Sequence, residues 1–124
     1  MKIKFFYYWK KYILSLFTSE REPWHIGYTK LTLDEVEERL IRIGYQPNYF
    51  SFQDSGQLTS MRVMYINDAS EWWQKHIRFF DDGEVRGHDE LSYEEDALAH
   101  KNGVGAKPID DETLILIKAA LDVY

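Results

Sequence analysis

The sequence lacks cysteine, long apolar runs and any recognisable secretion signal. With no cysteine among its 124 residues, the chain has no disulfide bond and no thiolate metal site. This composition suits a reducing compartment, so we expect a cytoplasmic location. No segment reaches the roughly 18–20 apolar residues of a membrane span. The N-terminus does not resemble a signal peptide, because Lys10 and Lys11 interrupt its apolar run.

The catalytic motifs with the most specific spacing are also missing. The sequence has no glycine-rich phosphate loop, no His-Glu-x-x-His helix and no Gly-x-Ser-x-Gly turn. Gly103–Lys107 is glycine-rich and ends in a lysine, but its spacing predicts a connection between two helices. The motifs present in the sequence therefore indicate neither an enzyme class nor a cofactor.

What the chain does have is an uneven distribution of charge. The net charge is −6, yet residues 1–18 contain four lysines and no acidic residue. The remaining 11 basic and 21 acidic residues give residues 19–124 a charge of 11 − 21 = −10. We therefore divide the chain into a basic, aromatic N-terminal helix over 1–18 and a single acidic domain over 19–124. Nucleic acid is a disfavoured partner for so acidic a body.

The N-terminal segment is predicted to be a helix over residues 4–17, with a strand over 2–9 as the alternative. Its apolar side chains recur at helical spacing, while four lysines give it a basic side. Such a segment can pack on the domain or on a second copy, or it can lie on a membrane surface. The side chains expected to contact a partner or a membrane are Phe5, Trp9, Lys10 and Lys11, together with Trp72 in the domain.

The strongest local signal is a helix over Leu33–Ile43. Thr32 and Glu35 have the spacing of a capping box, and Gly44 supplies the stop. Its apolar side chains form one stripe. We expect this stripe to cover one face of a sheet.

Four strands are predicted downstream of this helix. Their short connections favour an antiparallel meander, so the expected fold class is α+β, with a four-stranded antiparallel sheet, one helix on a face, and additional N- and C-terminal helices. Ser92 and Glu95 predict a short helix to about residue 100, and a last helix, apolar nearly all round, runs to about residue 122. The strands are expected over residues 48–53, 58–67, 72–80 and 84–91.

The hairpin formed by the last two strands organises the domain. A three-residue loop at Asp81-Asp82-Gly83, with Gly83 in the left-handed conformation, pairs Phe79 with Val85 and His76 with His88. Apolar residues then share one face and charged residues the other, whereas a two-residue turn would mix them. The outward-facing set is His76, Arg78, Glu84, Arg86, His88 and Glu90.

This outer face contains the candidate site. His76 and His88 could act as general base and general acid, and they are the candidate catalytic residues. Arginines stabilise phosphate, which makes a metal-independent phosphodiesterase conceivable. Metal binding by the two histidines with Glu90 is less favoured, so no metal ligand is assigned. The candidate anion-binding residues are Arg62, Arg78 and Arg86.

The functional hypothesis favoured by these observations is a small binding or regulatory module that acts through protein contacts, those of a homodimer included. Aromatic side chains are plentiful where the core has no obvious use for them, as at Trp72-Trp73, and such residues are enriched in interfaces. The alternatives are the ribonuclease-like phosphodiesterase and a peripheral membrane protein attached through residues 1–18.

Overall fold

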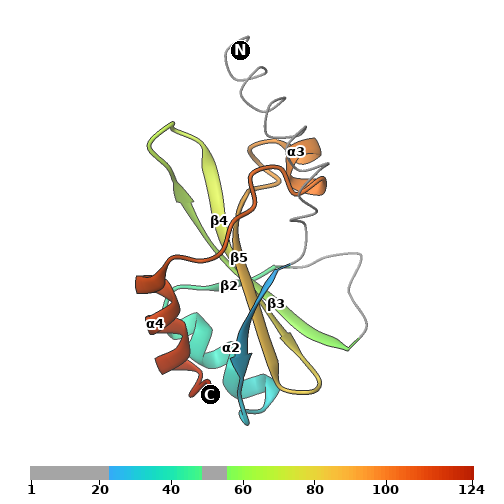
Figure 1. Ribbon diagram of the computed structural model, residues 1–124, viewed down its shortest axis with the longest axis vertical. Helices are drawn as coiled ribbons and strands as arrows, with labels where there is room; N and C mark the ends of the chain where they lie inside the picture. The colour runs from blue at the N-terminus through green and yellow to red at the C-terminus, as the bar shows by residue number, and fades with distance from the viewer. Residues whose placement is uncertain (1–22, 49–55) are drawn as a thin grey trace.

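The domain is an α+β fold built on a five-stranded antiparallel sheet (Figure 1). The computed structural model describes residues 23–48 and 56–124. The order of the strands across the sheet is β1-β5-β4-β3-β2. The strands are β1 Trp24–Tyr28, β2 Gln46–Pro47, β3 Gln57–Ile66, β4 Trp72–Phe80 and β5 Glu84–Leu91, and the helices are α2 Leu33–Arg42, α3 Ala97–Lys101 and α4 Asp111–Ala120.

The α+β class and the antiparallel sheet are confirmed, but the expected number of four strands is wrong. The sequence predicts a linker with an extended end over residues 18–30. Within that range, Trp24–Tyr28 forms β1 and pairs with β5. Its partner lies about 60 residues away, so local sequence signals do not reveal it. The expected strand over residues 48–53 lies almost wholly outside the described residues, and β2 is found just before it. The predicted N-terminal helix is also outside them.

The Leu33 helix is confirmed with its capping box. The Thr32 side chain accepts a hydrogen bond from the Glu35 backbone, and the Glu35 side chain accepts one from the Thr32 backbone. Gly44 follows the helix with φ +100°. Val36 and Leu40 are fully buried against Ile77 and other apolar residues of the sheet. As expected, α2 covers one face of the sheet.

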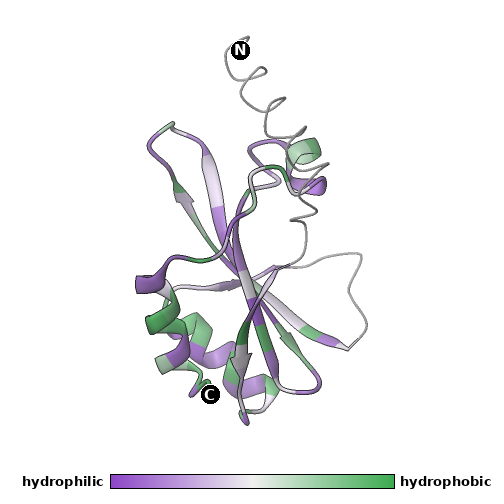
Figure 2. Ribbon diagram, viewed as in Figure 1, coloured by the Kyte–Doolittle hydropathy of each residue, from purple (hydrophilic) through white to green (hydrophobic). Residues whose placement is uncertain are grey.

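The two later helices differ in how well their limits are predicted. Ser92 caps only a turn, because it is Asp96 whose side chain accepts from the Ala99 backbone and starts α3. The last helix, α4, begins after Asp110 and ends at Ala120, close to the expected limits. Ile117 packs in the core, whereas other apolar side chains of α4 face away from it. Figure 2 shows the resulting apolar character of α4.

The organising hairpin has the predicted register. Gly83 has φ +90°, and its N–H donates to the Phe80 carbonyl at 3.0 Å. Phe79 pairs with Val85, and His76 pairs with His88. Val85 and Ile77 enter the main core, so the apolar face points inward as expected. The three-residue loop is therefore confirmed.

Candidate functional site

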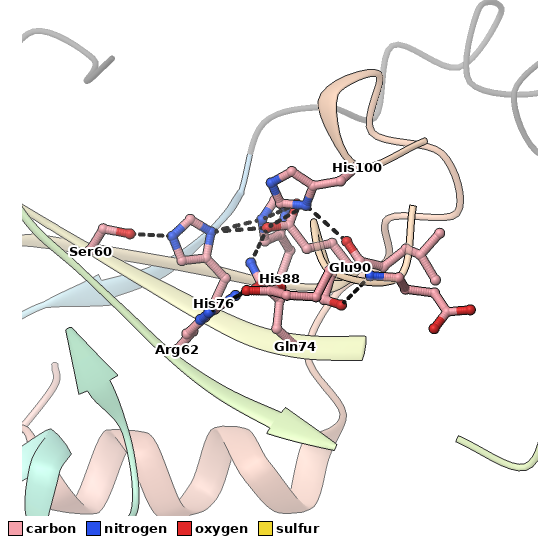
Figure 3. Close-up of polar contacts among 11 residues, drawn as sticks. Ser60, Arg62, Gln74, His76, His88, Glu90 and His100 are labelled. Carbon is pink, nitrogen blue, oxygen red and sulfur yellow. Dashed lines mark hydrogen bonds and ion pairs between the residues drawn. The ribbon is translucent and has the colours of Figure 1, made fainter. Parts of the chain in front are cut away.

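His76 on β4 and His88 on β5 lie side by side, as the register predicts (Figure 3). Nδ1 of His76 is 3.2 Å from Nε2 of His88. The Ser60 hydroxyl, on β3, hydrogen-bonds with Nε2 of His76. In the described part of the chain, Nδ1 of His88 is buried without a hydrogen-bond partner. All the polar contacts of the His88 ring are thus made by Nε2.

The expectation that this face is an outer, solvent-facing surface is wrong at the histidines. His76 and His88 are each 1% exposed. One reason lies in the segment after β5, where Glu94 reaches back to Arg62 on β3, with a carboxylate oxygen 2.7 Å from Nη2. The turn after β5 therefore lies over this face. The candidate site is a buried polar cluster between the sheet and its cover.

Glu90 joins the two histidines at the centre of this cluster. Its Oε2 is 3.1 Å from Nε2 of His88, and its Oε1 is 3.4 Å from Nδ1 of His76. The Gln74 side-chain amide donates to Oε1 of Glu90 at 2.7 Å, and Arg62 donates to the side-chain oxygen Oε1 of Gln74 at 2.9 Å. Figure 3 shows these polar groups converging from three neighbouring strands. The carboxylate is held by contacts on more than one side.

Burial and hydrogen bonding set the charges in the cluster. Burial lowers the pKa of His76 to about 4, although the nearby Glu90 carboxylate opposes the shift. Burial alone would raise the pKa of Glu90, but hydrogen bonds from His76 and His88 outweigh it and hold that pKa well below its usual range. Near neutral pH, Glu90 is therefore an anion and His76 is uncharged.

The three candidate anion-binding arginines are placed differently from one another. Arg62 reaches the cluster through Gln74 and is already paired with Glu94. Arg86 donates to Glu84 at 2.9 Å, and its guanidinium lies over the Phe80 ring. Arg78 pairs with Arg86 across the strands, two residue pairs nearer the turn than the histidines. Anion binding by these arginines stays a prediction.

Sequence reasoning missed three neighbours of the histidines. Extending the predicted hairpin register by two pairs beyond His76–His88 would have placed Gln74 opposite Glu90. Ser60 depends on the β3 register, which carries no comparable turn signal. His100 on α3 donates to the Leu91 carbonyl at 2.9 Å and lies 3.8 Å from Oε1 of Glu90. Nothing in the spacing of His100 predicts that position.

Among the described residues, the group with metal-ligand chemistry is His76, His88 and Glu90. One ligand atom from each of them lies within 4.8 Å of the others. Two imidazole nitrogens and a carboxylate oxygen form a ligand set typical of zinc and related ions. The three residues of the metal-binding alternative therefore lie close enough together to contact one ion.

The predicted contact residues divide into two groups. Trp72 is 43% exposed and pairs with the exposed Ile66 near the end of the β3–β4 hairpin. Phe5, Trp9, Lys10 and Lys11 lie outside the described residues. On α4, Ile115 is 70% exposed and Leu116 is 50% exposed. The apolar surface of α4 is a candidate site of protein contact. A helix that is apolar nearly all round is expected to have such a surface.

Fold and site together define an α+β domain with a buried histidine–carboxylate cluster. No family model, curated protein or solved structure matches this chain. Its function must therefore be inferred from its own geometry.

Proposed function

We propose that this chain is a small binding module that acts through protein contacts, and that its partner is a second copy of itself, met through α4. The observation that carries this proposal is the exposed apolar surface of α4. Ile115 and Leu116 face solvent on a helix whose opposite side, with Ile117, fills the core. Large exposed apolar side chains gathered on one element favour an interface.

The pattern of charge around Ile115 supports a second copy as the partner. At helical spacing, Asp111 and Lys118 lie on the same side of the exposed face, one turn before and one turn after Ile115. A two-fold axis through Ile115 places two α4 helices antiparallel, with Asp111 opposite the partner's Lys118 and the reverse. The face of α4 is therefore complementary to itself.

The size of this surface sets the expected strength of the contact. A stable complex usually buries about 800 Å² on each partner, and one short helix offers less than that. Exposed ion pairs add roughly 0.2–1 kcal/mol each, so they fix orientation more than affinity. We therefore expect a weak, concentration-dependent dimer.

Sedimentation over a wide concentration range tests the proposal. Ile115→Glu should abolish the dimer, whereas Leu98→Glu, the same kind of change at a 68% exposed site on α3, should leave it intact. Asp111→Lys and Lys118→Asp should each weaken the dimer, and the double variant should restore it. A monomer at every concentration, or equal effects at Ile115 and Leu98, would overturn the proposal.

The phosphodiesterase alternative stays a prediction. The contact between His76 and His88 supplies its acid–base pair, but both side chains are buried and Arg62 already pairs with Glu94. RNA cleavage assays of His76→Ala and His88→Ala, beside the unaltered chain, test it. Cleavage at the same rate in all three proteins would remove the hypothesis.

The membrane alternative also stays a prediction, because its residues 1–18 lie outside the described part of the chain. Within that part, every helix is too short or too polar to cross a bilayer. Surface attachment requires no such helix. Flotation of full-length and truncated protein with anionic vesicles decides the question.

A further inference from the structure

We infer that His76, His88 and Glu90 bind one divalent transition-metal ion per chain, with Zn²⁺ as the best fit. The three residues come from neighbouring positions of β4 and β5. The paired register sets the two imidazoles side by side, and Glu90, two residues after His88, shares their face of the sheet. The sheet itself therefore positions all three ligands.

The distance between the two imidazole nitrogens is that expected of ligands in a tetrahedral site. With Zn–N and Zn–O bonds of about 2.0–2.1 Å, ligand atoms at the corners of a tetrahedron are about 3.3 Å apart. The two nitrogens, Nδ1 of His76 and Nε2 of His88, are 3.2 Å apart. The Glu90 carboxylate spans the two rings, with Oε2 at 3.1 Å from the His88 nitrogen and Oε1 at 3.4 Å from the His76 nitrogen. One ligand atom from each of the three residues lies within 4.8 Å of the others, so a single ion can contact all three.

Neighbouring polar groups hold the ligands in this orientation. The Ser60 hydroxyl contacts Nε2 of His76, which leaves Nδ1 facing the other two ligands. Gln74 fixes the Glu90 carboxylate from β4, and Arg62 fixes Gln74. Metal-ligating histidines and carboxylates commonly have such supporting hydrogen bonds, which tune the affinity.

Charge also favours a cation at this position. The Glu90 carboxyl group has little exposure to solvent, and its direct partners are the Gln74 amide and the two imidazole rings. Burying a carboxylate without a nearby cation is costly, and the Arg62 guanidinium reaches it only through Gln74. A divalent ion bonded directly to Glu90 would compensate the buried charge.

The donor set selects among metals. Ca²⁺ prefers six to eight oxygen ligands and Mg²⁺ prefers an octahedral oxygen set, so two imidazoles and one carboxylate suit neither ion. Zn²⁺ and Co²⁺ accept this set with a fourth ligand. We assign the fourth position to water, because Nδ1 of His100 already donates to the Leu91 carbonyl.

The test uses the full-length, metal-free chain and two probes. Titration with Zn²⁺ should give one ion per chain and raise the thermal unfolding midpoint, because the ion binds the folded state. Co²⁺ should give the visible absorption of a tetrahedral site and be displaced by Zn²⁺. A folded chain that gives neither one-ion binding of Zn²⁺ nor the cobalt band overturns the proposal, and this result requires no variant.

Variants then locate the site. Glu90→Gln and His88→Asn should each weaken Zn²⁺ binding by more than about tenfold, with folding checked by circular dichroism. His25→Asn is the matched control, because His25 is an exposed histidine that pairs with Glu84 away from the cluster. Loss of binding in His25→Asn, with binding retained in the folded cluster variants, would place the metal elsewhere and contradict the assignment. The dimer tested through Ile115 is independent of these measurements.

Discussion

Gly83 shows how a single residue fixes the whole hairpin. Its φ is +90°, and a Cβ atom at this position would lie 2.7 Å from the Thr29 carbonyl oxygen. Gly83→Ala therefore adds a steric clash with backbone to the conformational cost of a left-handed alanine, which is about 1–2 kcal/mol. We expect a loss of more than about 2 kcal/mol in the free energy of unfolding, measured by urea denaturation.

Gly44 provides the control for that measurement. Its φ is +100°, but a Cβ atom there would meet nothing within 4 Å. Gly44→Ala should therefore show the conformational cost alone. Equal losses in the two variants would mean that the approach of Thr29 to the hairpin does not matter for stability.

For single residues, the sequence predicts which side chains pair across neighbouring strands but not how far they are buried. The glycine in the turn and the alternation of side chains place His76 opposite His88, and the structure has that register. The sequence does not show that Glu94 returns over the same face to reach Arg62. Alternation along a strand tells which side chains share a face, whereas their exposure depends on segments that follow the strand.

The capping box of α2 is the clearest prediction that belongs to an element. Thr32→Ala removes the hydroxyl that accepts from the Glu35 backbone, so we expect unfolding to become easier by about 1 kcal/mol. Thr32→Ser keeps the acceptor and should cost much less. Chemical denaturation of both variants makes the comparison, and a serine variant as unstable as the alanine variant would argue against the cap.

The start of α4 should give a measurable pH dependence. The Lys75 ammonium, followed by hydrogen bonds from Thr113, holds the pKa of Asp110 well below its usual range. A carboxyl with a lowered pKa stabilises the fold above its unfolded pKa of about 3.9, and this contribution is lost as the pH falls below that value. Asp110→Asn should therefore be less stable near neutral pH, with the difference shrinking towards about pH 3.

The measurement is the free energy of unfolding of the unaltered chain and of Asp110→Asn across that pH range. Because asparagine also caps helices well, the variant separates the charge from the cap. A stability difference that stays constant with pH would show that the Lys75–Asp110 ion pair, 2.8 Å long, contributes nothing through its charge.

Elements with local signals were predicted, and those without were missed. The α2 helix has its cap, stripe and stop between Thr32 and Gly44, and all three are confirmed. The β1 strand has no such signal, since it is a strand only because β5 provides an edge for it. The predicted start of α3 is wrong. Both Ser92 and Asp96 have side chains that can cap a helix, and only packing decides which of them does.

The arrangement of the sheet predicts which parts of the molecule open last. β4 lies between β3 and β5, whereas β2 is two residues long and pairs on one side. Native-state hydrogen exchange should therefore protect the β4 amides most, near the level of global unfolding, and the β2 amides far less. Protection of β2 equal to that of β4 would contradict this order.

For the whole molecule, the sequence predicts the fold class and one covered face. Alternating strands and an amphipathic helix suffice for an antiparallel sheet with α2 upon it. They do not predict that α3 and Val104 form a second apolar cluster with Trp73 and Leu91. That cluster depends on a loop of irregular structure, for which periodicity carries no information.

The pairing of β1 with β5 has a consequence for synthesis on the ribosome. β1 is made early, but its partner residues Glu84–Gly87 follow on the order of 60 residues later, a delay of roughly 3–12 s at common rates of translation. During that time the backbone N–H and C=O groups of β1 lack the β5 partners that they have in the folded domain. Unpaired strand edges promote aggregation during synthesis, so the chain is most exposed to it in the interval before β5 emerges.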